Sequence, residues 1–213
     1  MESVAVRPVR TKTDETRFIR FLWKLYAGDP YWVPQLMMDR KKLIDKKKNP
    51  FYTHADMELF LAERGGEIVG RIGAIVNHNH NKEHAENIGF FGFFESINDQ
   101  AVANALFDAA KKYLQSKGVT AMRGPANPSV NDEYGLLVDG FDSSPTVLMT
   151  YNPSYYATLL ERYGFRKLKD LYAYLLSQET VYSERFVRFN EIVKQREDLT
   201  FRTLDMKHFK EDV

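Results

Sequence analysis

Two tyrosines and three carboxylates are the side chains of this sequence whose types and positions could perform acid–base chemistry. Glu95 ends the apolar segment IGFFGFFE (88–95), where a carboxylate beside a cleft could accept a proton. The alternative is a charged strand end that meets solvent. Tyr155 and Tyr156 are adjacent, and either could donate a proton. Because neighbouring helix positions point about 100° apart, one of the two is expected to be a core aromatic instead.

The other two carboxylates lie in a long loop. Residues 124–145 contain three prolines and three glycines, and a loop of this length inside a compact domain is usually functional or mobile. Within it Asn131, Asp132 and Glu133 are consecutive, and carboxylates there could select a cationic amine. The alternative is a loop of Asx turns and solvated charge. We predict that Asn131 and Asp132 bind substrate and that Glu133 is a further catalytic carboxylate.

Two other polar clusters do not predict a site. The histidines of NHNHNKEH (77–84) match no standard zinc spacing. An Asn-rich segment between two strands reads most simply as a hairpin loop, so no metal site is expected. Arg40 and the neighbouring lysines form a basic run that is usually a solvated helix face, so no nucleic-acid partner is expected.

The composition excludes several classes of protein. The 213 residues are 44% hydrophobic and 14% aromatic, which is enough for a large core and excludes a disordered chain. Lys+Arg 30 against Asp+Glu 29 gives no general reason to expect an anionic partner. The absence of cysteine excludes disulfides and thiolate chemistry. With no signal peptide and no run of roughly 18 apolar residues, a cytoplasmic protein without a membrane partner is expected.

Hydrophobic periodicity predicts a mixture of strands and helices. Phe18 to Tyr26 carry a helical stripe after a cap at Thr13 or Asp14. Gly92, inside an apolar strand, suggests a bulge or a close approach of another backbone segment. The predicted strands are 4–9, 57–63, 67–76, 88–95, 119–123, 146–150 and 165–176, and the further helices are 35–48, 99–116, 153–163 and 180–196.

This order indicates a mixed α/β sheet, and two stretches carry a resemblance to a known family. YNPSYYATLLERYGF (151–165) resembles the fourth helix and following strand of GNAT acyltransferases. FFGFFES together with GPANPSVNDEYGLLVDGFD resembles an uncharacterised bacterial branch of that superfamily with tandem modules. The resemblance covers roughly residues 4–176. It implies a central, mostly antiparallel sheet with a splayed strand pair and helices on both faces.

The resemblance also implies an activity, the transfer of an acyl group from acetyl-CoA or another acyl-CoA to a small-molecule or protein amine. The thioester would lie between strands 88–95 and 119–123, diverging near Glu95 and Arg123. Two alternatives stay open: a non-catalytic GNAT-fold ligand-binding module, and a CoA-independent relative that takes an acyl or aminoacyl group from another carrier. A homodimer or a contact with a second GNAT-like module is also left open.

The family's functional positions can be carried over residue by residue. Phe93, Phe94 and Glu95 correspond to the segment that pairs with pantetheine, and Glu95 would deprotonate the amine. The usual general-acid tyrosine falls on Leu160, so Tyr156 is predicted as the catalytic acid. The remaining predicted cofactor-binding residues are Asn98, Asp99, Ala101, Ala103, Asn152 and Tyr155.

One of these positions departs from the family pattern. Asp99 stands where the pyrophosphate loop normally has a glycine. Its carboxylate would repel a phosphate and would cap the following helix, competing for the amides that a phosphate uses. We therefore expect acetyl-CoA to bind weakly.

The end of the chain predicts more than one domain: a GNAT-like domain over 1–178, a connecting amphipathic helix over 179–198, and the start of a second, truncated GNAT-like module over 199–213. The stretch after Leu199 echoes the opening of the chain, with a short strand and then a helix start. Such a start cannot form a stable unit alone, so the 213 residues are expected to be a fragment of a longer chain. The alternative is a frayed tail.

Overall fold

The computed structural model describes residues 2–177, 183–196 and 198–212. The chain divides into two compact units, Met1–Leu168 and Lys169–Val213. The second unit contains α7 (Glu184–Lys194), η2 (Met206–His208) and α8 (Phe209–Asp212). Phe186 and Phe189 of α7 are exposed, whereas Tyr182 lies outside the described residues. The predicted second module and the predicted domain boundaries stay predictions.

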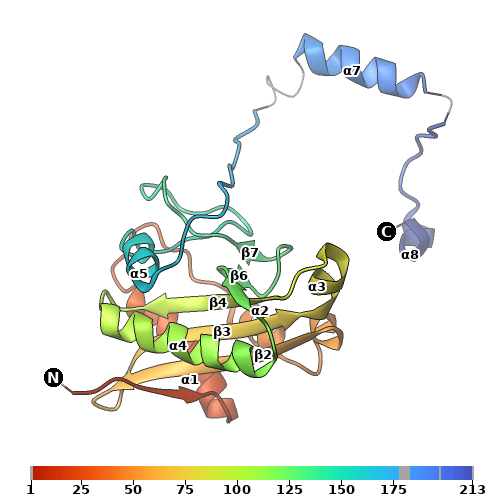
Figure 1. Cartoon of the computed structure of the whole chain (residues 1–213). Coiled ribbons are helices and arrows are strands. Elements are labelled where there is room, and N and C mark those ends of the chain that lie inside the picture. The colour runs from red at the N-terminus through yellow and green to blue at the C-terminus, as the bar shows by residue number, and fades with distance from the viewer. Residues whose placement is uncertain (1, 178–182, 197, 213) are drawn as a thin grey trace. The chain divides into compact units, whose positions relative to one another are not determined.

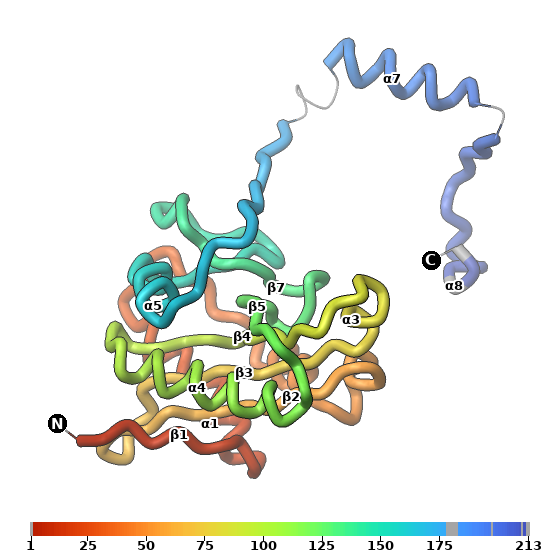
Figure 2. The backbone as a smooth tube through the Cα atoms, viewed as in Figure 1, coloured from red at the N-terminus to blue at the C-terminus, as the bar shows by residue number. Residues whose placement is uncertain are grey.

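The first unit is built on a five-stranded sheet in the order β1-β2-β3-β4-β5. Figures 1 and 2 show these strands side by side. Neighbouring strands are antiparallel except β4 and β5, which are parallel. This confirms the predicted mixed, mostly antiparallel sheet. The strands are β1 (Ala5–Pro8), β2 (Ala55–Arg64), β3 (Glu67–Asn77), β4 (Ile88–Ser96) and β5 (Ala121–Arg123).

Helices cover both faces of this sheet, and Figure 1 shows α4 in front of it and α1 behind. Alternate residues of a strand point to opposite faces, so Leu61 belongs to the buried cluster of α1 and Ala62 to that of α4. Two hydrophobic cores result, one on each face. The helices are α1 (Lys12–Leu25), α2 (Met37–Ile44), α3 (His78–His84), α4 (Gln100–Ser116) and α5 (Tyr156–Tyr163), with a 3₁₀ turn η1 (Pro50–Thr53).

Local polar contacts explain where the sequence-based boundaries were wrong. Helix α1 begins earlier than expected, because Thr11 accepts from the Asp14 amide in a capping box. NHNHNKEH forms a helix and not a loop, because the Asn77 side chain accepts from the His80 amide and starts it. Helix α2 ends at Ile44, and Asp45 then accepts from the Lys47 amide in a turn.

Two predicted strands do not form. Residues 146–150 contain a turn in which Thr146 accepts from the Met149 amide, and Leu148 has a positive φ of 65°. Residues 165–176 have strand-like composition but no ladder partner in the described part of the chain. A strand without a neighbour leaves its backbone groups unpaired, so composition alone does not produce one.

Strand β4 carries a bulge at its centre. Gly92 is opposite Gly73 and Glu95 is opposite Arg71, so Phe93 and Phe94 together face one residue of β3. Phe93 has a φ of 51°. A Cβ at Gly92 would lie 1.6 Å from the Ala126 carbonyl oxygen. Both expectations for Gly92, a bulge beside it and a close backbone approach, are confirmed.

The parallel ladder between β4 and β5 ends at Phe90 and Arg123, so the strands part as expected at Arg123 but well before Glu95. The segment 124–127 nevertheless stays against β4, and the Phe93 amide donates to Asn127 Oδ1. Residues Ala126–Asn127 form β6, which pairs with β7 (Glu133–Tyr134). Beyond Phe93 the segment that contains β6 no longer follows β4. There Phe94 and Glu95 line a cleft.

The contact at Gly92 predicts a specific loss of stability. Gly92→Ala should lower the free energy of unfolding by about 1–3 kcal/mol, because the new methyl group meets a backbone carbonyl that cannot rotate away. Gly89→Ala is the matched control on the same strand, where the Cβ meets side-chain atoms of Leu114 and no backbone atom within the three nearest contacts. Urea denaturation of both variants checks this, and an equal loss at the two positions would contradict it.

Candidate active site

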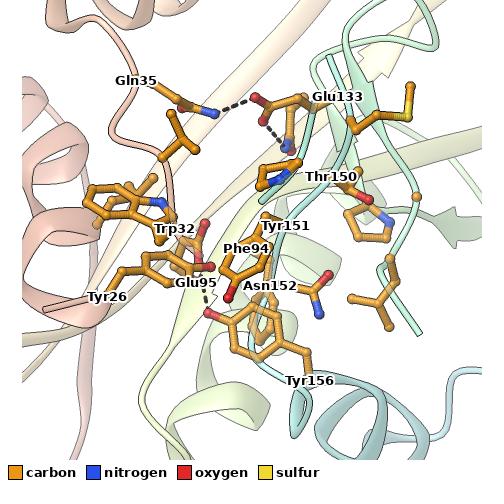
Figure 3. Close-up of a pocket in the computed structure, with 18 of the residues that line it drawn as sticks. Tyr26, Trp32, Gln35, Phe94, Glu95, Glu133, Thr150, Tyr151, Asn152 and Tyr156 are labelled. Carbon is orange, nitrogen blue, oxygen red and sulfur yellow. Dashed lines mark hydrogen bonds between the residues drawn. The ribbon is translucent and has the colours of Figure 1, made fainter. Parts of the chain in front are cut away.

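A cleft at the end of β4 collects side chains from distant parts of the chain (Figure 3). Tyr26 comes from the end of α1, Arg71 from β3, Glu95 from β4 and Tyr156 from the first turn of α5. The segments 32–40, 125–136 and 145–152 supply the remaining walls. The cleft is therefore a product of tertiary structure, and no single motif contains it.

The cleft contains a buried carboxylate, that of Glu95, which is 9% exposed. Its Oε2 accepts hydrogen bonds from the hydroxyls of Tyr26 at 2.8 Å and Tyr156 at 2.7 Å. Arg71 Nη2 lies 3.7 Å from Oε1. Both phenols therefore converge on one oxygen, and the other oxygen is paired only at a distance.

Arg71 is held mainly by contacts with Phe18 of α1. Its Nη1 donates to the Phe18 carbonyl at 2.9 Å, and its guanidinium lies 4.7 Å from the centre of the Phe18 ring. Its Nε is buried without a hydrogen-bond partner among the described residues. The cation therefore offsets the charge of Glu95 from one side without forming a close ion pair.

Burial sets the acid–base properties of this cluster. Desolvation raises the pKa of Glu95 above its ordinary value, against the opposing effects of Arg71 and the two tyrosines. Desolvation, followed by the nearby Glu95 charge, raises the pKa of Tyr156 well above its ordinary value. Glu95 is thus a stronger base than an exposed glutamate, and Tyr156 remains a protonated donor at neutral pH.

The two adjacent tyrosines take different positions. Tyr156 is almost fully buried and packs against Phe94, yet its hydroxyl donates to Glu95 and accepts from the Ser96 amide at 2.8 Å. It is both the expected core aromatic and a side chain of the cleft. Tyr155 donates to the Ser96 carbonyl oxygen at 2.7 Å, and burial raises its pKa to about 12. Their predicted catalytic and cofactor-binding roles stay predictions.

Glu133 lines the cleft, but its carboxylate already has partners. It forms an ion pair with Arg40 and accepts hydrogen bonds from Gln35 and Asn127. Of the neighbouring residues, Asp132 accepts from the Ser129 hydroxyl, and the Asn131 amide donates to the same hydroxyl. These contacts are those of the turn-forming alternative, and the predicted catalytic and substrate-binding roles remain untested.

The predicted cofactor contacts on β4 divide between the two faces of the sheet. Phe94 lines the cleft, whereas Phe93 packs edge-on against Phe18 in the opposite core. Asn152 also lines the cleft, and its side chain holds both the amide and the carbonyl of Leu137. Leu160, at the family's usual tyrosine position, is buried.

The predicted pyrophosphate seat lies at the start of α4, where Asp99 is the N-cap. Asp99 Oδ1 accepts from the amides of Ala101 at 2.8 Å and Val102 at 3.4 Å, and the Ala103 amide donates to the Asp99 carbonyl. Arg64 pairs with the other carboxylate oxygen at 2.8 Å. The amides there have internal partners, and Asn98 is exposed. Cofactor binding at these positions stays a prediction.

Several residues of the cleft were missed by the sequence analysis. Tyr26 ends the apolar stripe of α1, where spacing alone does not distinguish it from a core residue; it stacks on Trp32 with ring centres 5.2 Å apart. Tyr151 donates to both oxygens of Asp29 at 2.8 Å. Only Arg71 gave a usable signal, because a lone arginine inside the apolar strand EIVGRIGAIV needs a buried anionic partner.

The described residues contain neither a metal-binding cluster nor a membrane-spanning helix. Within residues 2–177, 183–196 and 198–212, no three or more His, Asp or Glu side chains are grouped so as to hold a metal ion. Over the same ranges, no helix is both long enough and apolar enough to cross a membrane.

Glu95 should titrate above the ordinary glutamate value of 4.5. A carboxyl ¹³C NMR titration of glutamate-labelled protein measures this, with Glu95→Gln identifying the resonance. Glu67 is the internal control, because its exposed hydrogen bond with Lys24 lowers its pKa. A Glu95 resonance that titrates at or below 4.5 would contradict the assignment of a desolvated carboxylate.

The same shift has a consequence for stability. Because folding raises the pKa of Glu95, its favourable contribution is complete below the ordinary value and is lost as the pH rises through the folded-state pKa. The melting temperature of the unaltered protein should therefore fall relative to that of Glu95→Gln as the pH rises from acid to neutral. A constant difference across that range would be the contrary result.

No protein-family model matches the chain. It is 42% identical over 172 residues to the bacterial ceramide synthase of Caulobacter vibrioides (strain NA1000 / CB15N), which covers 80% of this chain and 45% of that protein. It is 32% identical over 209 residues to protein YghO of Escherichia coli (strain K12), which covers 98% of this chain and 53% of that protein. The chain thus spans about half the length of the curated relatives it matches.

Among solved structures, the chain is similar to the aminoglycoside N-acetyltransferase AAC(6')-Iy in complex with a bisubstrate analog of CoA and acetylneamine. The TM-score is 0.50 at 14% identity, over 82% of this chain and 98% of that chain. Likeness at this identity concerns the fold alone. The mostly antiparallel sheet and the helices on both of its faces agree with it. The chain has the fold of the GNAT acyltransferases.

Proposed function

We propose that this chain is an N-acyltransferase domain that transfers an acyl group from acyl-CoA to a primary amine. The observation that supports this most is the buried carboxylate of Glu95, whose pKa is raised. Its Oε2 accepts hydrogen bonds from two tyrosine hydroxyls in the cleft. A primary amine is protonated at neutral pH, and only its free form attacks a thioester. A desolvated carboxylate is suited to remove that proton.

In the proposed reaction Glu95 takes a proton from the ammonium group of the acceptor. The nitrogen lone pair attacks the thioester carbonyl, the second proton passes from the nitrogen to solvent water, and the intermediate collapses to an amide and a thiolate. Tyr156 protonates the thiolate and recovers a proton through its hydrogen bond with Glu95. Tyr26 makes the second hydrogen bond to the same oxygen and so holds the carboxylate in one orientation. The products are one amide and one thiol.

For the acceptor, we propose the amine of a long-chain base. The support is the similarity to a protein named bacterial ceramide synthase, since a ceramide is the amide of a fatty acid with such a base. The corresponding donor is a long-chain acyl-CoA. The chain covers about half of that relative. This assignment therefore concerns only the acyl transfer that is proposed above for residues 2–168.

A second candidate is transfer from an acyl carrier other than CoA. The observation that favours it is the N-cap of α4, where the Asp99 carboxylate uses the amides that a pyrophosphate would need. A donor without a pyrophosphate avoids this conflict. Incubation of the chain with long-chain acyl-CoA or with acylated carrier protein, followed by mass spectrometry of the amide product, separates the two donors.

Glu95→Gln should reduce the rate of amide formation from a long-chain acyl-CoA and sphinganine by about 10²–10⁴-fold, the usual contribution of a general base. Tyr156→Phe should also reduce it. Tyr163→Phe is the matched control on the same helix, because its hydroxyl donates to Asp108 outside the cleft. Mass spectrometry measures the product. Full activity of Glu95→Gln would show that Glu95 is not the base.

CoA binding tests the role of Asp99. Asp99→Gly should bind CoA more tightly than the unaltered protein, because it frees the amides of Ala101 and Val102 and removes a carboxylate. Asp99→Asn keeps a capping oxygen and removes only the charge, so it should give a smaller gain. Isothermal titration calorimetry gives the three affinities. Tight binding to the unaltered protein that Asp99→Gly weakens would place the phosphate site elsewhere.

A further inference from the structure

The exposed apolar side chains of the first unit are concentrated in two segments. In its described residues, 2–168, every large hydrophobic residue that is exposed belongs to 31–38 or 130–149, with Leu168 as the exception. We call this set the apolar rim. Its members are Tyr31, Val33, Leu36, Met38, Val130, Val138, Val147, Leu148 and Met149. Contiguous exposed apolar surface on a folded domain usually marks a binding surface.

The two segments of the apolar rim meet at the mouth of the cleft. Val33 from the first and Met149 from the second both line it. Glu133 accepts from Gln35 and pairs with Arg40, which ties the second segment to the first. Figure 3 shows Gln35 and Glu133 pointing toward each other above the cleft. The two segments of the apolar rim therefore adjoin at the cleft that contains Glu95.

Basic side chains adjoin the apolar rim on α2. Met38, Lys41 and Lys42 are spaced at i, i+3 and i+4, so they share one face of the helix, and all three are exposed. Over residues 31–49 and 130–149, the exposed lysines outnumber the exposed carboxylates. The lysines are Lys41, Lys42, Lys46, Lys47 and Lys48, and the carboxylates are Asp39, Asp139 and Asp142.

We infer that the apolar rim and the α2 lysines dock on the surface of an anionic lipid bilayer, with the mouth of the cleft facing the acyl chains. An apolar face bordered by lysines is the pattern of interfacial proteins, whose apolar side chains enter the boundary of the bilayer while the cations meet anionic headgroups. This docking departs from the sequence-based expectation of no membrane partner. That expectation rested on the lack of a spanning segment, which surface docking does not require. The docking also requires no net charge on the whole chain, because headgroup attraction falls off within a Debye length.

The inference extends the proposed function, because a long-chain amine held in a bilayer could then reach Glu95 without crossing water. It stands on lipid binding alone and not on turnover. If vesicle binding fails while amide formation is observed, only the docking surface is wrong. If vesicle binding holds and no amide forms, the docking surface remains and the proposed reaction is wrong.

Sedimentation with vesicles of phosphatidylcholine, with and without phosphatidylglycerol, tests the docking. The unaltered chain should partition onto the anionic vesicles. The double variant Val147→Asp/Leu148→Asp should bind at least about tenfold more weakly, because carboxylates replace apolar groups at the interface. Leu168→Asp is the matched control, since Leu168 is exposed in the same unit outside the apolar rim.

Lys41→Glu/Lys42→Glu should also weaken partitioning onto anionic vesicles by roughly tenfold or more. Lys111→Glu/Lys112→Glu, an adjacent exposed pair on α4, is its control and should change it much less. Circular dichroism melts establish that each variant is folded. Equal binding by rim and control variants overturns the inference. So does absent binding by the unaltered chain, or a dimer that the rim substitutions dissolve.

Discussion

The burial of one carboxylate constrains the arrangement of the whole first unit. An unpaired charge in a protein interior is strongly unfavourable, so Glu95 is compatible with the fold only while Tyr26, Tyr156 and Arg71 keep their positions. These partners come from α1, α5 and β3. Helices on opposite faces of the sheet therefore both contact the carboxylate of Glu95 on β4. The two hydrophobic cores position these elements, and the contacts of Glu95 with its three partners fix how the elements meet at the cleft.

Much of the fold could be predicted from the sequence. The long periodic segments were found because burial on one face imposes its own spacing: β2, β3, β4 and α4 agree with the prediction to within a few residues. The errors lie where short-range polar contacts decide. Asn77 starts a helix in a segment that composition assigned to a loop, and residues 165–176 have the pattern of a strand without a partner.

The candidate site was less predictable than the fold. Glu95 and Tyr156 were identified as candidates, and the structure places their side chains in direct contact. Tyr26 was not identified, because at the end of an apolar helical stripe a tyrosine cannot be distinguished from a core residue by spacing. Glu133 was predicted as a catalytic carboxylate, and its ion pair with Arg40, which is distant in sequence, was not predicted. Such pairings arise from tertiary packing and leave no local signal.

The contact between Asn127 and the bulge of β4 has a thermodynamic consequence. The Phe93 amide, turned by a positive φ, already donates to an amide oxygen of the protein itself. Any ligand that pairs with this amide through a carbonyl oxygen exchanges one hydrogen bond for another of the same kind, so the exchange itself contributes little net enthalpy. Its affinity would then be set by displacement of the segment 124–127. Since Asn127 also donates to Glu133, that displacement would also break a hydrogen bond at the mouth of the cleft.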